Sequence, residues 1–256
     1  MSKGELAESM SVEGDEVCFK KSQYVVYEPY RGLHLAYHAK KYVFSRQSKY
    51  QKIDIIDNDA YGRMLFLDGN VQHTAYDARV FNEALCGHVK RSDASRVVVL
   101  GGGSGQTAIT LLESPRIEHI TVVDIDDAVV RCCRRYIRGV EAALGNPRVD
   151  LEIGDAFEHM RNTKDRFDAA VIDFTEIPFR MRTSSAVLKK LYANIRDKCD
   201  GRCSQYIGSL VGLAQGPRHK KLVDSVGRQF LSNVTYEEAF IPSFGAPHTF
   251  MHAGYV

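Results

Sequence analysis

The second half of the chain alternates short apolar runs with stretches in which apolar residues recur at helical spacing. Strands that alternate with helices predict parallel strands joined by crossover helices on both faces of one sheet. The predicted strands are 97–100, 120–124, 149–153, 169–173 and 205–208, and the predicted helices between them include 127–144 and 185–198. Two later apolar runs, 234–241 and 249–255, have only a short link rich in proline and glycine between them. Such a link predicts an antiparallel hairpin at one edge of the sheet.

The N-terminal part of the chain has a different pattern. Residues 51–56 alternate polar and apolar side chains, as a strand with one buried face does. Turn residues follow at 58–62 and at 68–70, with the apolar run 63–67 between them. We therefore expect a small antiparallel β domain. The expected organisation is a flexible N-terminus (1–22), the small β domain (23–76) and a Rossmann-like nucleotide-binding catalytic domain (77–256).

Composition narrows the function classes. A chain of 256 residues with 44% hydrophobic residues is long and apolar enough to bury a large core. Its formal net charge of +2, with no dominant basic stripe, gives no electrostatic case for nucleic acid. No apolar run approaches a membrane span, and the start lacks the apolar segment of a signal peptide. The six cysteines form no CxxC pair and the histidines show no metal-ligand spacing, so we expect a reduced, cytoplasmic chain without a metal.

The most informative chemistry follows the predicted strand 97–100. Five residues, Gly101-Gly-Gly-Ser-Gly105, come directly after it and lead into a helix. Glycines let a backbone approach a ligand closely, and the N–H groups of the helix point at the same place. Asp124 ends the next strand, just over twenty residues on, where a carboxylate can accept hydrogen bonds from ribose hydroxyls. Together these features predict a pocket for an adenosine-containing molecule.

Five motifs occur in order along the chain. They are Ser48-Lys-Tyr-Gln51, Leu67-Asp-Gly-Asn-Val-Gln72, Gly101–Gly105, Gly154-Asp-Ala156 and Val171-Ile-Asp173. Together they resemble the polyamine aminopropyltransferases, the spermidine synthase family, over about residues 37–250. The resemblance implies an α/β fold: a Rossmann-like, seven-stranded methyltransferase-type sheet with a small N-terminal antiparallel β domain. It also implies transfer of an aminopropyl group from decarboxylated S-adenosylmethionine to a small-molecule amine, with release of methylthioadenosine, by a homodimer or homotetramer.

The same resemblance implies roles for particular residues. Asp173 would be the general base, which the reaction needs because an alkyl amine is mostly ammonium at neutral pH. Glu176 would assist it. The implied donor-binding residues are Gln51, Gln72, Gly101, Gly103, Ser104, Asp124, Ile125, Asp155 and Ala156, with Asp124 on the ribose and Asp155 and Ala156 at the adenine edge. The implied acceptor-binding residues are Phe81, Asn82, Phe174 and Phe244.

Most of these residues also have a purely structural interpretation. Asp124 and Asp173 end predicted strands, where an acid often only caps the next helix. Asp155 follows a glycine and could be a turn residue. The two glutamines could be polar positions on strand faces, and Phe244 could be a core aromatic residue.

The chain departs from the family pattern where substrates would be recognised. The family carries Asp at the position of Ser104, and that Asp pairs with the donor's ammonium and repels the carboxylate of intact S-adenosylmethionine. A neutral serine removes this repulsion, so either sulfonium nucleotide fits, and the intact one would donate a 3-amino-3-carboxypropyl group. The family usually has Tyr at the position of Phe81, Gln or His at that of Asn82, and a small hydroxyl residue at that of Phe174. The expected acceptor is therefore larger than a short diamine, more apolar, or of a different kind altogether.

Three alternatives stay open at this point. An S-adenosylmethionine-dependent N-methyltransferase needs only a rotated donor tail. A lyase or cyclase that acts on the donor alone needs no amine site. A catalytically impaired regulatory homologue would explain the clustered substitutions, although Asp124 and Asp173 argue against it.

Overall fold

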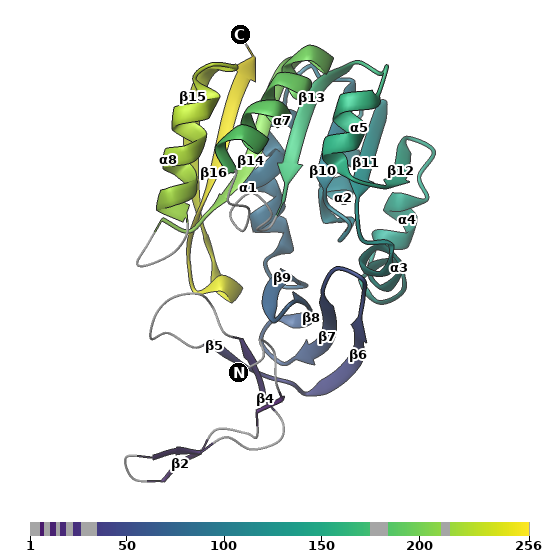
Figure 1. The fold of residues 1–256 in the computed structure, drawn as a ribbon. Helices are drawn as coiled ribbons and strands as arrows, with labels where there is room; N and C mark the ends of the chain where they lie inside the picture. Colours follow the sequence, from purple (N-terminus) through teal and green to yellow (C-terminus); the bar gives the residue numbers. More distant parts are fainter. Residues whose placement is uncertain are drawn as a thin grey trace. The chain divides into compact units, whose positions relative to one another are not determined.

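The computed structural model describes residues 6–7, 11–13, 16–18, 23–26, 35–174, 184–210 and 216–255. The chain divides into two compact units. The N-terminal unit comprises residues 1–78 and 242–244, and the sheet unit comprises residues 79–241 and 245–256 (Figure 1).

The N-terminal unit contains only β-strands and one short 3-10 turn among its described residues before Ala78 and at 242–244. Its four-stranded antiparallel sheet has the order β6-β7-β8-β9, and a three-stranded sheet has the order β1-β4-β5. The strands are β1 (Leu6–Ala7), β2 (Ser11–Glu13), β3 (Glu16–Cys18), β4 (Gln23–Val26), β5 (Leu35–His38), β6 (Lys41–Gln47), β7 (Lys52–Asn58), β8 (Gly62–Leu67) and β9 (Asn70–Thr74), with β2 paired to β3. The small antiparallel β domain is thus confirmed, and β1 to β3 lie within the stretch expected to be flexible.

Turn chemistry fixes the register of the four-stranded sheet. Asp68 and Gly69 join β8 to β9 with positive φ angles of 48° and 77°. Two consecutive positive φ angles are the mark of the tight turn whose twist matches that of paired strands. The side chain of Asp68 also accepts a hydrogen bond from the Lys52 N–H at 2.8 Å, which ties this turn to β7. At the other end of β7, the side chain of Asn58 accepts hydrogen bonds from the next turn's N–H groups.

A segment from late in the chain belongs to the N-terminal unit. The hydroxyl of Tyr37 donates to the carbonyl of Ser243, and the N–H of Ser243 donates to Asp77 Oδ2 at 2.7 Å. Phe244 packs, partly buried, against the unit's apolar core. The sequence placed these residues in one domain over 77–256. The structure differs because these hydrogen bonds and this apolar contact attach the short helix η1 (Pro242–Phe244) to the N-terminal unit.

The sheet unit is built on seven strands in the order β12-β11-β10-β13-β14-β16-β15. The first five are parallel, and the last two form an antiparallel hairpin that joins them through β14. The strands are β10 (Arg96–Gly101), β11 (His119–Asp124), β12 (Val149–Ile153), β13 (Phe167–Asp173), β14 (Cys199–Gly208), β15 (Leu231–Ile241) and β16 (Ala246–Tyr255). This arrangement confirms the predicted seven-stranded α/β sheet and its terminal hairpin.

Helices cover both faces of this sheet (Figure 1). In the view of Figure 1, α5, α7 and α8 lie in front of the strands, and α1 and α2 lie behind them. The helices are α1 (Ala78–Lys90), α2 (Gln106–Leu112), α3 (Asp127–Tyr136), α4 (Val140–Leu144), α5 (Ala156–Asn162), α7 (Ser184–Lys198) and α8 (Gly216–Gly227). The crossover geometry therefore brings the loops after β10, β11 and β13 to one edge.

The expected single helix over 127–144 is wrong. Ile137 leaves the helical conformation with φ −101° and ψ 127°, and Gly139 adopts a left-handed φ of 84°. These two residues end α3 and redirect the chain into α4. Helical spacing of apolar residues continues across the break, so the pattern alone could not locate it.

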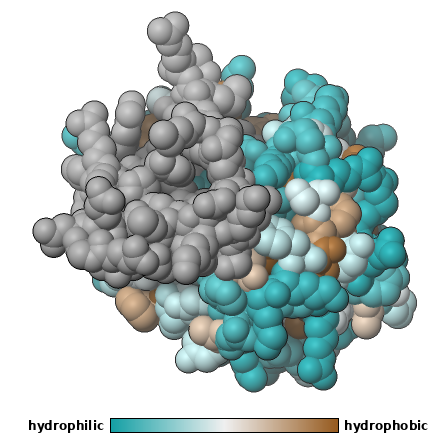
Figure 2. All heavy atoms as spheres, turned by 90° about the horizontal axis from the view of Figure 1, so that it is seen from below, coloured by the Kyte–Doolittle hydropathy of each residue, from teal (hydrophilic) through white to brown (hydrophobic). Residues whose placement is uncertain are grey.

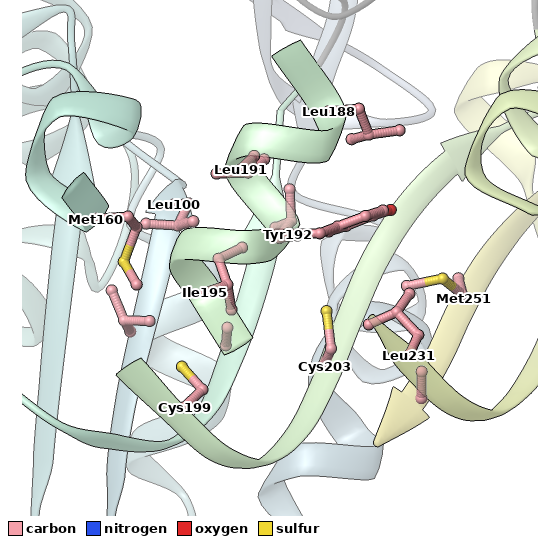
Figure 3. Packing of buried hydrophobic residues seen from close by; sticks show 14 of the residues in the cluster. Leu100, Met160, Leu188, Leu191, Tyr192, Ile195, Cys199, Cys203, Leu231 and Met251 are labelled. Atoms are coloured by element: carbon pink, nitrogen blue, oxygen red, sulfur yellow. The ribbon is translucent and has the colours of Figure 1, made fainter. Parts of the chain in front are cut away.

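A hydrophobic core of the sheet unit lies between the sheet and α7. Leu188, Leu191, Tyr192 and Ile195 recur at helical spacing on α7 and belong to one buried cluster. In Figure 3, Leu191 extends toward Leu100 and Met160, and Tyr192 extends to the opposite side of the helix. All four are almost completely buried, and full burial of a leucine side chain contributes about 1.5–3 kcal/mol. The hydroxyl of Tyr192 donates to the side chain of Gln205 at 2.6 Å, so this buried polar group is satisfied. This core fixes α7 against the sheet, including the C-terminal strands β14 and β16.

The surface gives two plain observations. The face shown in Figure 2 carries hydrophilic side chains over most of its coloured area, with hydrophobic ones confined to small parts of it. Among the residues that the structure describes, no helix is long and apolar enough to cross a membrane.

Candidate active site

Strand register brings the predicted acids to one edge of the sheet. Gly101 of β10 pairs with Asp173 of β13. On its other side β10 pairs Leu100 with Val123 of β11, so Gly101 lies level with Asp124. One glycine is therefore flanked by two carboxylates at the carboxyl ends of adjacent parallel strands. In open α/β sheets this edge is where ligands bind.

Glycine is required in the turn after β10 because the flanking acids leave no room for a side chain. A Cβ atom on Gly101 would lie 2.5 Å from the backbone oxygen of Asp173. A Cβ atom on Gly103 would lie 2.6 Å from Cγ of Asp124. Gly101 also has a positive φ of 87°, which other residues rarely adopt. The glycines thus allow the close approach of backbone and carboxylate that defines this edge.

Asp124 is held by backbone N–H groups. Its Oδ2 accepts a hydrogen bond from Gly103 at 2.8 Å, and its Oδ1 accepts one from Asp126 at 2.9 Å. Removal of water raises the pKa of Asp124, and the two N–H groups partly offset this by stabilising the charged form. The helix cap of α3 is Asp126, whose side chain accepts from Ala128. Asp124 is therefore not the cap of the following helix.

Asp155 does cap a helix. Its Oδ1 accepts hydrogen bonds from the N–H groups of Phe157 at 2.7 Å and Glu158 at 3.4 Å, at the start of α5. Asp155 thus has a structural role, as a helix cap, that the sequence interpretation did not name. It is compatible with ligand contact, because Asp155 also lines the cavity of this edge.

Asp173 is half-buried, and its carboxyl group accepts a hydrogen bond from a threonine. The hydroxyl of Thr107, on α2, lies 3.0 Å from Asp173 Oδ2. Removal of water from around the carboxyl group raises the pKa of Asp173 to about 6, and the charge of Asp124 adds to this. The hydrogen bond from Thr107 acts in the opposite direction. A carboxylate with such a pKa can accept a proton near neutral pH.

Thr107 also touches Asn82. The side-chain oxygen of Asn82, on α1, lies 3.2 Å from the hydroxyl of Thr107. Asn82 is 5% exposed and Thr107 is 0% exposed. The structure places the Asn82 side chain against Thr107, and the predicted contact of Asn82 with the acceptor stays a prediction.

A cavity of about 400 Å³ opens at this edge, on the side of α5 and α7. Predicted site residues make up part of its lining: Gly101, Ile125, Asp155, Ala156 and Phe174. The sequence interpretation missed the others, which are Val123, Phe157, Glu158, Arg161, Val187, Lys190 and Asn194. The last three recur at helical spacing on one face of α7, which was the one signal that could have identified them.

Two stacked aromatic rings form one wall of the cavity. The rings of Phe174 and Phe157 lie 5.5 Å apart at an interplanar angle of 9°. Phe174 follows Asp173 directly but contacts α5, whereas the carboxyl group of Asp173 contacts α2. The two neighbours therefore point toward opposite faces of the sheet, as successive residues of an extended strand do.

Phe81 belongs to an aromatic cluster rather than to the cavity lining. Its ring lies 5.1 Å from that of Tyr206 and 5.2 Å from that of Phe250. Tyr206 follows Gln205, which pairs with Ile172, so the cluster lies level with Asp173 in the sheet. The hydroxyl of Tyr206 lies 2.7 Å from Nδ1 of His248, and burial lowers the pKa of His248 to about 4. This cluster thus presents aromatic rings and a neutral histidine.

Other predicted residues lie elsewhere. Gln51 and Gln72 are half-buried in the N-terminal unit, where Gln51 donates its N–H to Ser48 Oγ at 3.0 Å. Ser104 is half-buried in the glycine turn and only distantly contacted by the Gln106 N–H, at 3.5 Å. Phe244 packs against the N-terminal unit's core. Glu176 lies outside the described residues. The roles of these residues stay predictions.

In the part of the chain that the structure describes, no group of three or more His, Cys, Asp or Glu residues could hold a metal ion. Five cysteines, at positions 86, 132, 133, 199 and 203, are buried and unpaired by disulfides.

Two protein families together match nearly the whole described chain. A family described as the spermine/spermidine synthase domain matches residues 74–246. A family described as the spermidine synthase tetramerisation domain matches residues 24–75. The border between the two matches falls close to the border between the N-terminal unit and α1.

Curated relatives carry one name. A polyamine aminopropyltransferase of Thermococcus onnurineus is 29% identical over 171 residues, which cover 65% of this chain and 61% of the relative. One of Clostridium kluyveri is 32% identical over 148 residues, which cover 57% of this chain and 53% of the relative. The matched part thus spans a little over half of the length of these relatives.

Solved structures share the fold. A spermidine synthase in complex with the transition state analogue AdoDATO superposes with a TM-score of 0.79 at 21% identity, covering 91% of this chain and 80% of that one. The spermidine synthase of Thermotoga maritima gives a TM-score of 0.77 at 21% identity, with coverage of 91% and 78%.

The close contact between Gly103 and Asp124 can be tested by substitution. Gly103→Ala would drive its Cβ into the Asp124 carboxyl group, so we expect the free energy of unfolding to fall by about 1–3 kcal/mol. Gly154→Ala is the matched control, because its Cβ would meet only the flexible side chain of Glu152 at 3.4 Å. Urea denaturation measures both variants. Equal effects of the two substitutions would contradict the packing described for Gly103.

Proposed function

The chain belongs to the spermine/spermidine synthase family, and on that premise we propose that it is an aminopropyltransferase. The donor is decarboxylated S-adenosylmethionine or, with a 3-amino-3-carboxypropyl group, S-adenosylmethionine itself. The acceptor is a small-molecule amine. The observation that carries this proposal is the pair of desolvated carboxylates, Asp124 and Asp173, on either side of Gly101.

The chemistry requires one displacement and one proton transfer. The nitrogen lone pair of the amine attacks the carbon beside the sulfonium sulphur. The carbon–sulphur bond breaks, its electrons stay on sulphur, and methylthioadenosine leaves. The attacking nitrogen must have lost a proton to be nucleophilic, and Asp173 accepts that proton. Its pKa of about 6 leaves it ionised at neutral pH and still basic enough to serve.

The donor nucleoside is assigned to the cavity beside Asp124. Half-buried Ile125, buried Ala156 and the stacked rings of Phe157 and Phe174 offer flat apolar surface of the kind an adenine ring needs. Asp124 still has acceptor capacity beyond its two backbone N–H bonds, which suits ribose hydroxyls. The sulfonium then gains from nearby carboxylates and aromatic rings.

The acceptor is assigned to the opposite side of Asp173. Phe81, Tyr206 and Phe250 form an aromatic cluster level with Asp173, next to a histidine that burial keeps neutral. Such a surface favours the alkyl portion of an amine and adds no positive charge that would repel it. Glu176 is proposed to assist Asp173, and the N-terminal unit to form the contacts of a homodimer or homotetramer in a cytoplasmic enzyme.

The role of Asp173 gives a first kinetic prediction. Asp173→Asn is expected to lower kcat by about 10²–10⁴-fold, because the amide cannot accept the proton. In the unmodified protein kcat/KM for the donor rises through about pH 6, since protonation of Asp173 in the free protein below that pH removes the base. The exposed Asp165, changed to Asn, is the control and is expected to leave both quantities unchanged.

Product analysis separates the alternatives in the same assay. Methylthioadenosine that forms only when an amine is present supports aminopropyl transfer. S-adenosylhomocysteine would indicate methyl transfer, methylthioadenosine without amine would indicate a lyase, and full turnover by Asp173→Asn would contradict the assigned base.

Ser104 gives a second prediction, about the donor. Ser104→Asp would restore the negative charge that the family carries at this position. A like-charge contact at intermediate dielectric costs a few kcal/mol, so kcat/KM for intact S-adenosylmethionine relative to the decarboxylated donor should fall at least tenfold. Ser104→Asn, which adds similar bulk without charge, should leave the ratio within about threefold. Equal behaviour of the two variants would show that position 104 does not face the donor's terminal group.

A further inference from the structure

The hydroxyl of Thr107 has two polar neighbours and one proton. Its oxygen lies 3.0 Å from Asp173 Oδ2 and 3.2 Å from Asn82 Oδ1. The two distances fall within hydrogen-bond range, and a hydroxyl can donate to only one oxygen at a time. The buried position of Thr107, at 0% exposure, keeps this geometry away from bulk water.

The three residues come from three separate elements of the sheet unit. Asn82 lies on α1, Thr107 lies in the first turn of α2, and Asp173 ends β13. The contact lies beside the glycine turn: a Cβ on Gly102 would lie 3.6 Å from Asp173 Oδ2 and 3.9 Å from Thr107 Cβ, both ordinary contact distances. Gly102 itself has a positive φ of 81°, which favours glycine at this position.

The geometry points to Thr107 as a positioning residue for Asp173, with Asn82 holding the hydroxyl of Thr107 rather than the amine acceptor. This inference rests on the proposed function, because it assigns a partner to the proposed base. We call the hydrogen-bonded chain Asp173–Thr107–Asn82 the relay, and its donors and acceptors have two settings. With ionised Asp173, Thr107 donates to the carboxylate and accepts from the Asn82 amide nitrogen. With protonated Asp173, the carboxyl O–H donates a hydrogen bond to the Thr107 oxygen, and the Thr107 hydroxyl donates one to the Asn82 amide oxygen.

The amide of Asn82 suits both settings, because it presents an acceptor and a donor that exchange places on rotation about one bond. A leucine of similar size has neither group. Donation by Thr107 to the charged carboxylate lowers the pKa of Asp173, against the effect of burial. Loss of the relay is therefore expected to keep Asp173 protonated to a higher pH.

The variants that test the relay differ in one polar group each. Thr107→Val removes the hydroxyl and keeps the branched shape, and Thr107→Ser restores the hydroxyl. Asn82→Leu removes the second partner. Thr110→Val is the matched control, because Thr110 lies on the same helix, is also buried, and its hydroxyl donates to the backbone oxygen of Gln106.

Two readouts follow each variant: titration of the Asp173 carboxyl carbon by NMR in the free protein, and the pH dependence of kcat. Thr107→Val should raise the midpoint of both by about one pH unit, the equivalent of one charge-assisted hydrogen bond. The ionised fraction then falls about threefold at pH 6.5 and hardly at pH 8.5. Thr107→Ser and Thr110→Val should stay close to the unmodified protein. Asn82→Leu should move in the same direction as Thr107→Val, with the KM for the amine within about twofold.

The outcomes are distinct. An unmoved midpoint in Thr107→Val, or an equal shift in Thr107→Ser, overturns the relay. A tenfold rise in the amine KM of Asn82→Leu with an unmoved midpoint shows that Asn82 contacts the acceptor. Thr107→Ala takes the place of the valine variant if the latter fails to fold. If the NMR midpoint moves as expected while no amine yields methylthioadenosine, the relay stands and the proposed function fails.

Discussion

The removal of water from two carboxyl groups is the physical constraint on which the site depends. Asp124 and Asp173 end neighbouring strands on either side of Gly101, and burial raises the pKa of both. An isolated buried carboxylate is costly, so each needs donors. Asp124 receives two backbone N–H groups, and Asp173 receives the hydroxyl of Thr107. The negative charge that these donors leave uncompensated favours a positively charged ligand at this edge of the sheet.

The sheet divides the chemistry between its two faces. The cavity lies on the face of α5 and α7, where Phe157 and Phe174 stack and the α7 residues Val187, Lys190 and Asn194 complete the lining. The relay to Asp173 lies on the face of α1 and α2. A donor in the cavity would reach the edge from one side, while the base is held from the other. This separation lets the carboxyl group be positioned by protein atoms without blocking the ligand.

The strands and their terminal acids were predictable because parallel strands buried on both faces read as continuous apolar runs. Asp124 and Asp173 each follow such a run, and the edge at which parallel strands meet is a general property of the fold. The contact of Thr107 with Asp173 and Asn82 was not predictable. It joins residues 66 and 25 positions apart in the sequence, and only the packing of two helices against one strand brings them together.

The other differences from the sequence prediction have causes that the pattern of apolar residues does not record. The break at Gly139 lies inside an uninterrupted helical pattern, so only the left-handed backbone reveals it. Ser243 joins the N-terminal unit through hydrogen bonds to residues about 200 and 166 positions earlier, which no local pattern records. Asp155 was interpreted either as a turn residue or as a ligand contact; the structure shows that it caps α5 and also lines the cavity.

The measurement that tests the account most directly is the titration of Asp173 with and without a bound sulfonium. A cation held close to a carboxylate favours its charged form, so saturation with decarboxylated S-adenosylmethionine should lower the pKa of Asp173 below its value of about 6 in the free protein. Methylthioadenosine has the same nucleoside and no charge, and should not lower it. Equal titration of Asp173 in the two complexes would contradict the claim that this edge holds a positively charged sulphur beside the base.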